Sequence, residues 1–522
     1  FPIDRPQEVR ALTSFKTHPV RFLSASADGG TLCYTYDGEI YTQSVKGKPH
    51  KVKISLTRDD EELPLNTYSY GARSAVVSPD GKQVAFIIRG EVFVTSVEYG
   101  TTRQITHTPE AEAGLSFGAD NRTLVYASLR GGNWELYTAK IAREDDLNFP
   151  NATLIKEEPL LPSKSVERTN PKFSPNGEEV AFIEDRTQLK VVNLKSKKVR
   201  QITDGSTWYS LSGGFDYAWS PDGKWFTLEF IVHHHDPYAD IALVSADGKG
   251  QLINITNSGY SSSSPKWVMG GNAILFMTER YGMRNHASWG SQDDLMLAFV
   301  NQDAYDKFRL SKEDYELLKE LEKEQKKKDK ADKDKDKDEK DEKEQEDIIV
   351  EPEGIEDRIV RLTPNSSNIG SAIIPKDGEA LYYLSAFEKG YDLWKMDLRK
   401  HDTKLLHKGA GWGDMTLDKD EKTLFLLGSN LKKMTLPSGG LTSINYQARL
   451  KIDRDAERRF MFDYVYKEEK KRFYETSMHG VDWEGLTAAY RKFLPHIDNN
   501  QDFAELLSEW LGELNVSHTG GR

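Results

Sequence analysis

Cysteine is almost absent from this 522-residue sequence, in which Cys33 is the single one. A lone cysteine excludes an internal disulfide framework and any metal site built from several cysteines. Long apolar runs are also missing, because no stretch reaches the ~18–20 consecutive apolar residues that a membrane-spanning helix requires. The sequence therefore predicts no membrane span, and its motifs suggest neither a metal nor another cofactor.

Positive charge is not in excess either, since 71 Lys and Arg face 83 Asp and Glu, for a formal net charge of −12 at pH 7. A nucleic-acid-binding domain needs a basic face, so this balance argues against nucleic acid as a partner. Hydrophobic residues make up 37% of the chain, which is enough for folded cores. At this length we expect two or three domains.

A short unit recurs from the N-terminus to about residue 440: an apolar strand, a turn rich in Asp, Asn and Gly, and a second apolar strand. Ser78-Pro79-Asp80-Gly81 is typical. Proline sets the first turn dihedral, aspartate hydrogen-bonds back to the chain, and glycine takes a positive φ. Corresponding turns lie at residues 26–29, 118–121, 174–177, 220–223, 269–272, 375–378 and 418–421, and we expect apolar strands at 83–88, 123–127, 179–183 and 224–230.

Most of these turns are about 40–56 residues apart, close to the ~40–50 residues per blade of four-stranded propeller repeats. A β-sandwich is the alternative, but it would not repeat the same turn chemistry at blade spacing so many times. The fold class we predict is therefore mainly β, as an array of propeller blades.

One gap between turns is long, and a charged insertion at residues 303–355 fills it. Ser311 begins a helical stretch with Leu317 and Leu321, which runs into a Lys/Asp/Glu tract at 322–347. This tract cannot bury an apolar face, so we expect a solvated helix or a mobile segment rather than a partner-binding tail.

Residues 233–236 read His-His-His-Asp and raise the hypothesis of a metal site. Alternate residues of a strand share a face, so only His233 and His235 can converge, which leaves an incomplete ligand set. A loop of a blade is the favoured interpretation.

The hydrophobic period changes from two to roughly 3.6 after about residue 448. We expect a helix from Asp455 to Glu475 ended by Gly480, a second helix capped by Asp482, and a third over 501–514. Three helices in this short segment bury little surface alone, so the domain needs neighbours.

Two motifs near the end are specific. Residues 478–483 read Met-His-Gly-Val-Asp-Trp, and residues 512–520 read Gly-Glu-Leu-Asn-Val-Ser-His-Thr-Gly. Both resemble the first core segment of tricorn-type serine proteases. Residues 18–24, 36–42, 89–96 and 219–225 likewise resemble bacterial members of this family, so the resemblance covers essentially the whole chain.

That family combines a six-bladed propeller, a seven-bladed propeller, a helical core domain, a PDZ domain and a second core domain. The resemblance implies that residues 1–66 are the last blade of a truncated first propeller and 67–447 a seven-bladed β-propeller. Residues 448–522 would be a truncated, small α-helical first core domain. The chain thus resembles an internal fragment that lacks the PDZ domain and the second core domain.

The family's peptidase site pairs a Ser-His dipeptide of the first core domain with a serine nucleophile and a glutamate of the second. The resemblance therefore assigns His518 as the general base and Ser517 as a neighbour that helps to orient the catalytic groups. An imidazole with a pKa near ~6.5 can accept a serine proton at neutral pH. The nucleophile would lie in the missing half, so we expect the chain alone to be inactive.

The function that the resemblance implies is that of a serine peptidase which degrades or trims peptides, with the propeller channelling them to the active site. Peptide substrates, the missing C-terminal half and further copies of the chain are the expected partners, and the bacterial periplasm is the expected location, with the cytoplasm as the alternative. A second hypothesis is a non-catalytic propeller scaffold that binds peptides or envelope partners, as TolB-like propellers do. A prolyl-oligopeptidase relative is less well supported, because a Gly-x-Ser-x-Gly elbow is missing.

Overall fold

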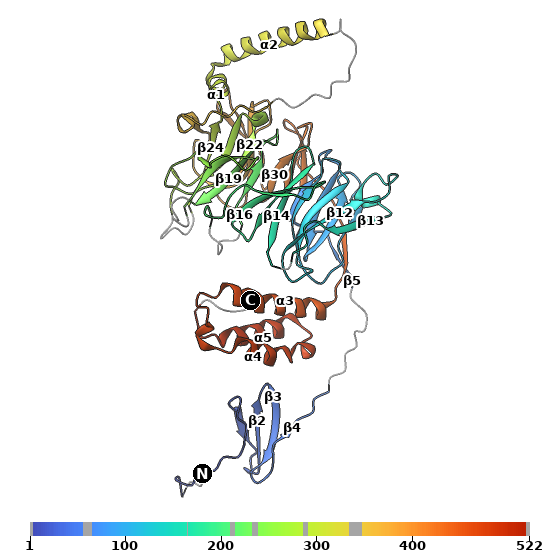
Figure 1. Cartoon of the computed structure of the whole chain (residues 1–522), viewed down its shortest axis with the longest axis vertical. Helices are drawn as coiled ribbons and strands as arrows, with labels where there is room; N and C mark the ends of the chain where they lie inside the picture. Colours follow the sequence, from blue (N-terminus) through green and yellow to red (C-terminus); the bar gives the residue numbers. More distant parts are fainter. Residues whose placement is uncertain are drawn as a thin grey trace. The chain divides into compact units, whose positions relative to one another are not determined.

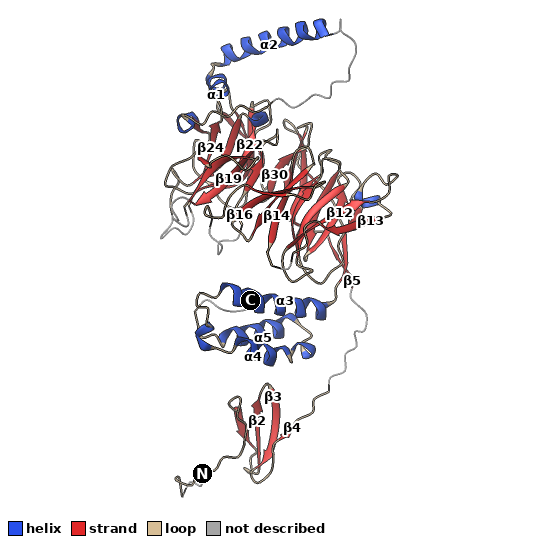
Figure 2. Cartoon of the chain, viewed as in Figure 1, coloured by secondary structure: helices blue, strands red, loops and turns tan. Residues whose placement is uncertain are grey.

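The computed structural model describes residues 4–55, 65–163, 165–208, 214–231, 238–284, 291–333 and 347–517 (Figure 1). The chain divides into two compact units. The first unit combines Phe1–Leu65 with Lys451–Arg522, and the second is Asn66–Leu450. Figure 2 shows that strands dominate the second unit, whereas the first contains one small sheet and a group of helices.

Seven four-stranded antiparallel sheets form the described part of the second unit, and each follows the order of the chain. They comprise β6 (Arg73–Val77), β7 (Gln83–Ile88), β8 (Glu91–Ser96) and β9 (Thr102–Gln104); β10 (Glu112–Phe117), β11 (Thr123–Ser128), β12 (Glu135–Ile141) and β13 (Ile155–Pro159); β14 (Arg168–Phe173), β15 (Glu179–Glu184), β16 (Gln188–Asn193) and β17 (Val199–Gln201); β18 (Tyr217–Trp219), β19 (Trp225–Ile231), β20 (Ala239–Ser245) and β21 (Ile253–Asn254); β22 (Ser262–Val268), β23 (Ala273–Thr278), β24 (Asp294–Phe299) and β25 (Ile359–Arg361); β26 (Asn368–Ile373), β27 (Ala380–Ala386), β28 (Asp392–Asp397) and β29 (Asp402–His407); and β30 (Asp414–Leu417), β31 (Thr423–Leu427), β32 (Leu431–Thr435) and β33 (Thr442–Ser443).

The first strands of neighbouring sheets contact one another, as β6 contacts β10 and β10 contacts β14, so they are the innermost strands of a propeller-type arrangement. The last sheet also contacts the first. The hydroxyl of Tyr446 accepts a hydrogen bond from the backbone N–H of Ala72 at 3.1 Å, and β31 contacts β6. Two further strands, β5 (Leu65–Tyr68) and β34 (Ala448–Lys451), pair where the chain enters and leaves this unit.

The repeated turns join the first and second strands of the sheets. In the turn before β7, the Ser78 hydroxyl donates to Asp80 Oδ1 at 2.6 Å and accepts from the Gln83 N–H at 3.0 Å, while Gly81 has a φ of 70°. Ser26, Ser174 and Ser220 make the same pair of contacts. The strands expected after four of these turns are confirmed as β7, β11, β15 and β19 within one residue at each end.

A second repeated contact ties the outer half of a sheet together. After the fourth strand β25, the Thr363 hydroxyl donates to the carboxylate of Asp294 at 2.8 Å and accepts from the N–H of Leu295 at 3.1 Å. Asp294 begins the third strand and is fully buried. We call this arrangement the threonine clasp. It recurs with Thr106 and Glu91, and with Thr256 and Asp240.

Apolar side chains from neighbouring sheets share common cores. Val92 and Val94 of one sheet pack with Leu124 and Tyr126 of the next, all of them buried. Successive sheets up to β30–β33 share cores in this way, so the stability of a sheet depends on its neighbours.

The charged insertion lies between β24 and β25 and begins with two helices, α1 (Gln302–Arg309) and α2 (Lys312–Lys333). Ser311 caps α2, because its hydroxyl accepts from the N–H of Asp314 at 3.1 Å. Phe308 of α1 and Tyr315 at the start of α2 are buried, whereas Leu317 and Leu321 further along α2 are mostly exposed, so only the later part of α2 is solvated. The remainder of the tract, 334–346, lies outside the described residues, as does the 233–236 histidine segment.

The first unit contains the sheet β1 (Arg21–Ala25), β2 (Thr31–Tyr36), β3 (Glu39–Ser44) and β4 (His50–Lys51), and the helices α3 (Arg454–Arg472), α4 (Trp483–Arg491) and α5 (Asn500–Gly512). Three buried rings form the centre of the helical part. Trp510 stacks on Phe462 at 4.2 Å and on Trp483 at 4.6 Å between ring centroids.

The first of these helices is slightly shorter than expected. Helix α3 ends at Arg472, three residues before the expected Glu475, because Phe473 leaves the helical conformation, and the chain then turns through Met478, His479 and Gly480, all with positive φ. The cap of α4 is confirmed, since Asp482 accepts from the N–H of Gly485 at 2.9 Å. No helix among the described residues is long and apolar enough to cross a membrane.

We predict that Thr363→Val destabilises the second unit by about 2–3 kcal/mol, because it leaves the Leu295 N–H and the buried Asp294 carboxylate without this hydroxyl. Urea unfolding of the whole chain measures the change. The control Thr101→Val, at an exposed position, should shift stability by less than about 0.5 kcal/mol. Equal effects of the two substitutions would contradict the importance of the clasp.

Candidate functional site

The structure places Ser517 shortly after the end of α5. Backbone hydrogen bonds from Leu514 to Leu511 and from Asn515 to Gly512 turn the chain there, and the Leu514 side chain is fully buried. Ser517 is exposed at the surface of the first unit. His518, the expected general base, lies outside the described residues, so the geometry of the Ser517–His518 pair is not part of the structure.

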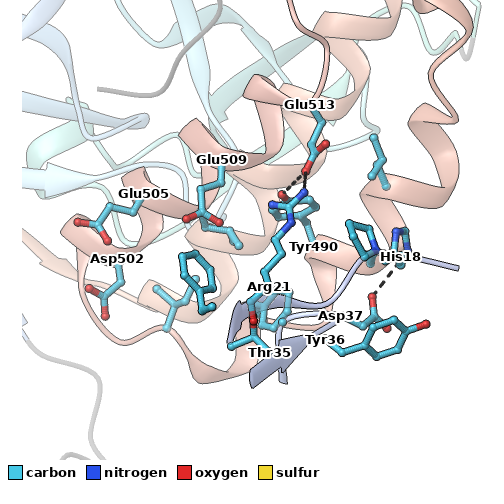
Figure 3. Close-up of a pocket in the computed structure, with 18 residues that line it drawn as sticks. His18, Arg21, Thr35, Tyr36, Asp37, Tyr490, Asp502, Glu505, Glu509 and Glu513 are labelled. Carbon is cyan, nitrogen blue, oxygen red and sulfur yellow. Dashed lines mark hydrogen bonds and ion pairs between the residues drawn. The ribbon is translucent and has the colours of Figure 1, made fainter. Parts of the chain in front are cut away.

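A cleft of about 440 Å³ opens in the same unit, between α4 and α5 on one side and the β1–β4 sheet on the other (Figure 3). We call it the α4–α5 cleft. Its floor is apolar, with Phe22, Leu486, Phe493 and Leu506 among the lining residues. Glu513, which is four positions before Ser517 in the sequence, is another lining residue.

Carboxylates follow one side of the cleft. Asp502, Glu505, Glu509 and Glu513 lie along one face of α5 in Figure 3, as their spacing of three or four residues requires. Arg21 faces the last of them, with its guanidinium 3.6 Å from the Glu513 carboxylate. Glu513 also accepts from the Tyr490 hydroxyl at 3.1 Å, and burial, together with this carboxylate, raises the pKa of Tyr490.

The β1–β4 sheet approaches α4 closely at Gly38. A Cβ built on Gly38 would lie 1.6 Å from Cζ of Phe493, and its φ is 73°. Two ion pairs flank this contact: Lys492 lies 3.3 Å from Asp37, and Asp37 lies 3.8 Å from His18. Only glycine fits here, so the sheet and the helices of this unit pack as one body.

We predict that Gly38→Ala destabilises the first unit far more than Gly29→Ala. Gly29 has a similar φ of 66° but nothing within 4 Å of an added Cβ, so it isolates the backbone cost of about 1–2 kcal/mol. Urea unfolding followed by tryptophan fluorescence compares the two variants. Similar midpoints would show that Phe493 moves aside without cost.

A second group of polar residues lies among the innermost strands of the second unit. The ammonium of Lys266 on β22 is 2.6 Å from the Asp414 carboxylate and 3.1 Å from the Ser371 hydroxyl. Asp414 begins β30 and Ser371 lies on β26, so one lysine connects three sheets. We call Lys172, Lys266 and Asp414, with the residues they contact, the axial cluster.

Lys172, on the innermost strand β14, extends this cluster. Its ammonium donates to the backbone carbonyl of Tyr217 and lies 4.5 Å from the centre of the Tyr217 ring. Burial lowers the pKa of Lys172, although the nearby carboxylates of Asp216 and Asp414 oppose this. The Asp414 side chain, at the start of the innermost strand β30, is 64% exposed.

The carboxyl group of Glu229 lies near the ammonium group of Lys172. It accepts from the N–H of Ser264 at 2.8 Å, and burial, followed by the nearby Asp216 carboxylate, raises its pKa to about 7. The axial cluster therefore contains a carboxyl group that changes its charge near neutral pH.

Two proline motifs in the sequence mark the lysines of this cluster. Lys172 and Lys266 each follow a proline in an innermost strand, within Asn170-Pro171-Lys172 and Ser264-Pro265-Lys266. Both strands have a bulge there, with Asn170 and Ser264 at positive φ, and the bulge changes the direction of the following side chain.

Known proteins resemble this chain both in its C-terminal helices and along most of its length. The family described as the tricorn protease C1 domain matches residues 454–512, which contain α3, α4 and α5. A tricorn-like protease C-terminal subunit of Sulfurisphaera tokodaii is 22% identical over 95% of this chain and 54% of its own length. Tricorn protease homolog 1 of Streptomyces coelicolor is 24% identical over 95% of this chain and 47% of its own.

The fold of this chain is also similar to that of a solved protein. The crystal structure of the tricorn protease aligns with 97% of this chain and 47% of its own, with a TM-score of 0.71 and 14% identity. A propeller-type body of four-stranded sheets combined with a C1 helical domain is thus the class of structure found here. The chain is a homologue of the tricorn-type proteases, and it spans about half the length of the relatives that it matches.

We predict that Glu229→Gln stabilises the chain at pH 8 but not at pH 4.5. The unfolded chain ionises Glu229 as pH rises past 4.5, whereas the folded chain keeps this proton until about pH 7. The contribution of this group to stability is therefore complete below pH 4.5 and falls between pH 4.5 and 7, by at most about 3 kcal/mol.

Thermal unfolding at both pH values measures this difference. Glu178→Gln, at an exposed turn, serves as the matched control and should leave the midpoint unchanged at either pH. A gain from Glu229→Gln that is equal at pH 4.5 and pH 8 would contradict the raised pKa.

Proposed function

We propose that this chain is part of a tricorn-like serine peptidase that degrades or trims peptides. The observation that carries the proposal is the match of residues 454–512 to the tricorn protease C1 domain, directly before Ser517 and His518. The two tricorn-type relatives, which align over 95% of the chain, support it.

In this proposal His518 is the general base. It takes the proton of a serine hydroxyl as the serine oxygen attacks the peptide carbonyl, and it then returns the proton to the leaving amine. The acyl-enzyme that forms is hydrolysed by water in the same way. Ser517 positions these groups, and the nucleophile and its acidic partner belong to a second core domain outside these 522 residues.

The second unit has the role of a passage in this scheme. We assign its seven four-stranded sheets as the blades of one closed propeller over residues 67–447, and residues 1–66 as the last blade of a first propeller. An axial passage between innermost strands admits an extended chain and excludes a folded protein. The exposure of Asp414, which begins an innermost strand, supports such a passage.

Two further parts of the proposal concern the surroundings of the chain. Periplasmic location and assembly with further copies of the chain follow from the resemblance to bacterial tricorn homologues. The missing half would provide the PDZ domain and the nucleophile.

The test compares two proteins on one fluorogenic peptide. We expect no turnover by the isolated 522-residue chain, and turnover by the protein encoded by the complete gene. His518→Ala in that protein should lower kcat by about 10⁴-fold, as loss of a catalytic base does. His496→Ala, in the same helical domain, is the control and should retain activity.

Turnover by the isolated chain that depends on His518 would contradict the division of the site between two domains. A gene that ends at Arg522 would instead favour a non-catalytic scaffold that binds peptides.

A further inference from the structure

The α4–α5 cleft combines an apolar floor with an excess of negative charge. Five of its lining residues carry a carboxylate and one carries a guanidinium, namely Asp37, Asp502, Glu505, Glu509 and Glu513, and Arg21. Its volume of about 440 Å³ is in the range of sites that hold a ligand. The proposed peptidase chemistry assigns no role to this cleft.

Some of these carboxylates already have cationic partners. Asp37 lies 3.3 Å from the ammonium of Lys492, and Glu513 lies 3.6 Å from the guanidinium of Arg21. Glu505 and Glu509 are exposed, and no Lys, Arg or His among the residues that the structure describes pairs with either of them. In Figure 3, Arg21 reaches toward Glu513, while Glu505 and Glu509 lie along α5. The cleft therefore lacks positive charge at these two positions.

A β-bulge in β1 places an aromatic ring at the cleft. Phe22 lies in this bulge with a φ of 53° and is 82% exposed. Four sheets of the second unit have the same bulge in their first strand, and the residue with positive φ there is Ser74, Gly114, Asn170 or Ser264. Such small or polar residues tolerate this conformation better than a large ring does. The exposed ring and the apolar floor together form a surface of the kind that marks interaction sites.

The cleft lies at the end of the β1–β4 sheet rather than on one of its faces. Arg21 begins β1, and Gly38 lies in the turn between β2 and β3 at the same end of the sheet. Blades of a propeller pack against one another by their faces, as the shared cores of the second unit show. In the assignment of residues 1–66 as a blade, a neighbouring blade therefore covers a face of this sheet and leaves the cleft open.

The spacing of the unpaired carboxylates fits alternate side chains of an extended chain. An α-helix rises about 1.5 Å per residue, so Glu505 and Glu509 are displaced by about 6 Å along α5. An extended chain rises about 3.3 Å per residue, so side chains two positions apart are separated by about 6.6 Å and point the same way. Two basic side chains with one residue between them can thus pair with Glu505 and Glu509. The intervening side chain then points away from α5, toward the side of the cleft that carries Phe22.

We propose that the α4–α5 cleft binds short extended peptide segments in which Lys or Arg alternates with large apolar residues. Charge complementarity selects this occupant, because the carboxylates of α5 repel an acidic segment and stay unpaired beside a neutral one. The apolar residues of the segment cover Phe22 and the cleft floor, which removes apolar surface from water. This binding site goes beyond the proposed peptidase function and does not depend on it.

The test is a titration of the whole 522-residue chain into the fluorescein-labelled peptide Lys-Leu-Lys-Phe-Lys, followed by fluorescence anisotropy at low ionic strength. We expect the double variant Glu505→Gln, Glu509→Gln to raise Kd by about fivefold or more, since it removes two ion pairs. The matched control is Glu316→Gln, Glu320→Gln, which removes the same charge at the same four-residue spacing from α2, where both residues are exposed. This control should change Kd by less than about twofold.

Phe22→Ser tests the apolar half of the site. The fold should tolerate this change, because Ser74 and Ser264 occupy the corresponding bulge position in two other sheets, and circular dichroism checks it. We expect Kd to rise by about fivefold or more, as truncation of a central interface ring does. The peptides Glu-Leu-Glu-Phe-Glu and Lys-Ser-Lys-Ser-Lys should bind at least about tenfold more weakly, because each lacks one half of the match.

Equal losses for the two double variants would overturn the proposal, since the peptide would then respond only to the net charge of the chain. Unchanged Kd for Phe22→Ser, or tight binding of either control peptide, would overturn it too. Self-association of the chain that Glu505→Gln, Glu509→Gln abolishes would assign the cleft to a second copy instead.

The protein encoded by the complete gene should bind the peptide as the 522-residue chain does. Loss of binding in that protein would show that another part of it fills the cleft, against the proposal. The His518 test is separate, because turnover of a fluorogenic peptide reports on the chemistry and this titration reports only on the α4–α5 cleft.

Discussion

The threonine clasp fixes the outermost strand in three sheets of the second unit, those with Thr106, Thr256 and Thr363. A sheet of four strands can lose its outermost strand easily, because that strand has a neighbour on one side only. In the clasp, a hydroxyl after the fourth strand binds both the backbone and the buried acid at the start of the third, as Thr363 does with Asp294. Burial of the acid makes the contact costly to break, since a buried carboxylate that loses a hydrogen bond cannot replace it with water. The outer edge of the sheet is thereby fixed to its inner part.

Much of the fold followed from local chemistry that the sequence displays directly. The turn at Ser78–Gly81 encodes its own hydrogen bonds, so the strand that follows it starts where the sequence indicates. The residues that begin two helices, Asp482 and Ser311, could also be predicted from the sequence. The end of α3 could not, because Phe473 ends the helix through packing against the aromatic core rather than through a glycine. Tertiary packing of this kind leaves no local signal.

The candidate sites differ in how far the sequence predicts them. Ser517 and His518 were identified through resemblance alone, because two adjacent residues at a chain end carry no geometric information. The axial cluster needed the structure, since Lys266 and Asp414 are 148 positions apart and meet only when the sheets surround one axis. The contact between Gly38 and Phe493 was hidden for the same reason.

The insertion between β24 and β25 shows how tolerant this architecture is of chain length. The chain leaves the sheet, forms two helices, and returns to place β25 beside β24 in the usual register. The entropic cost of such a detour grows only by about 0.6 kcal/mol for each doubling of its length. Because the clasp at Thr363 secures the returning strand whatever its path, the outer connection of a sheet is a position where evolution can add a segment without disturbing the axis. New modules can therefore be acquired on the rim while the passage stays unchanged.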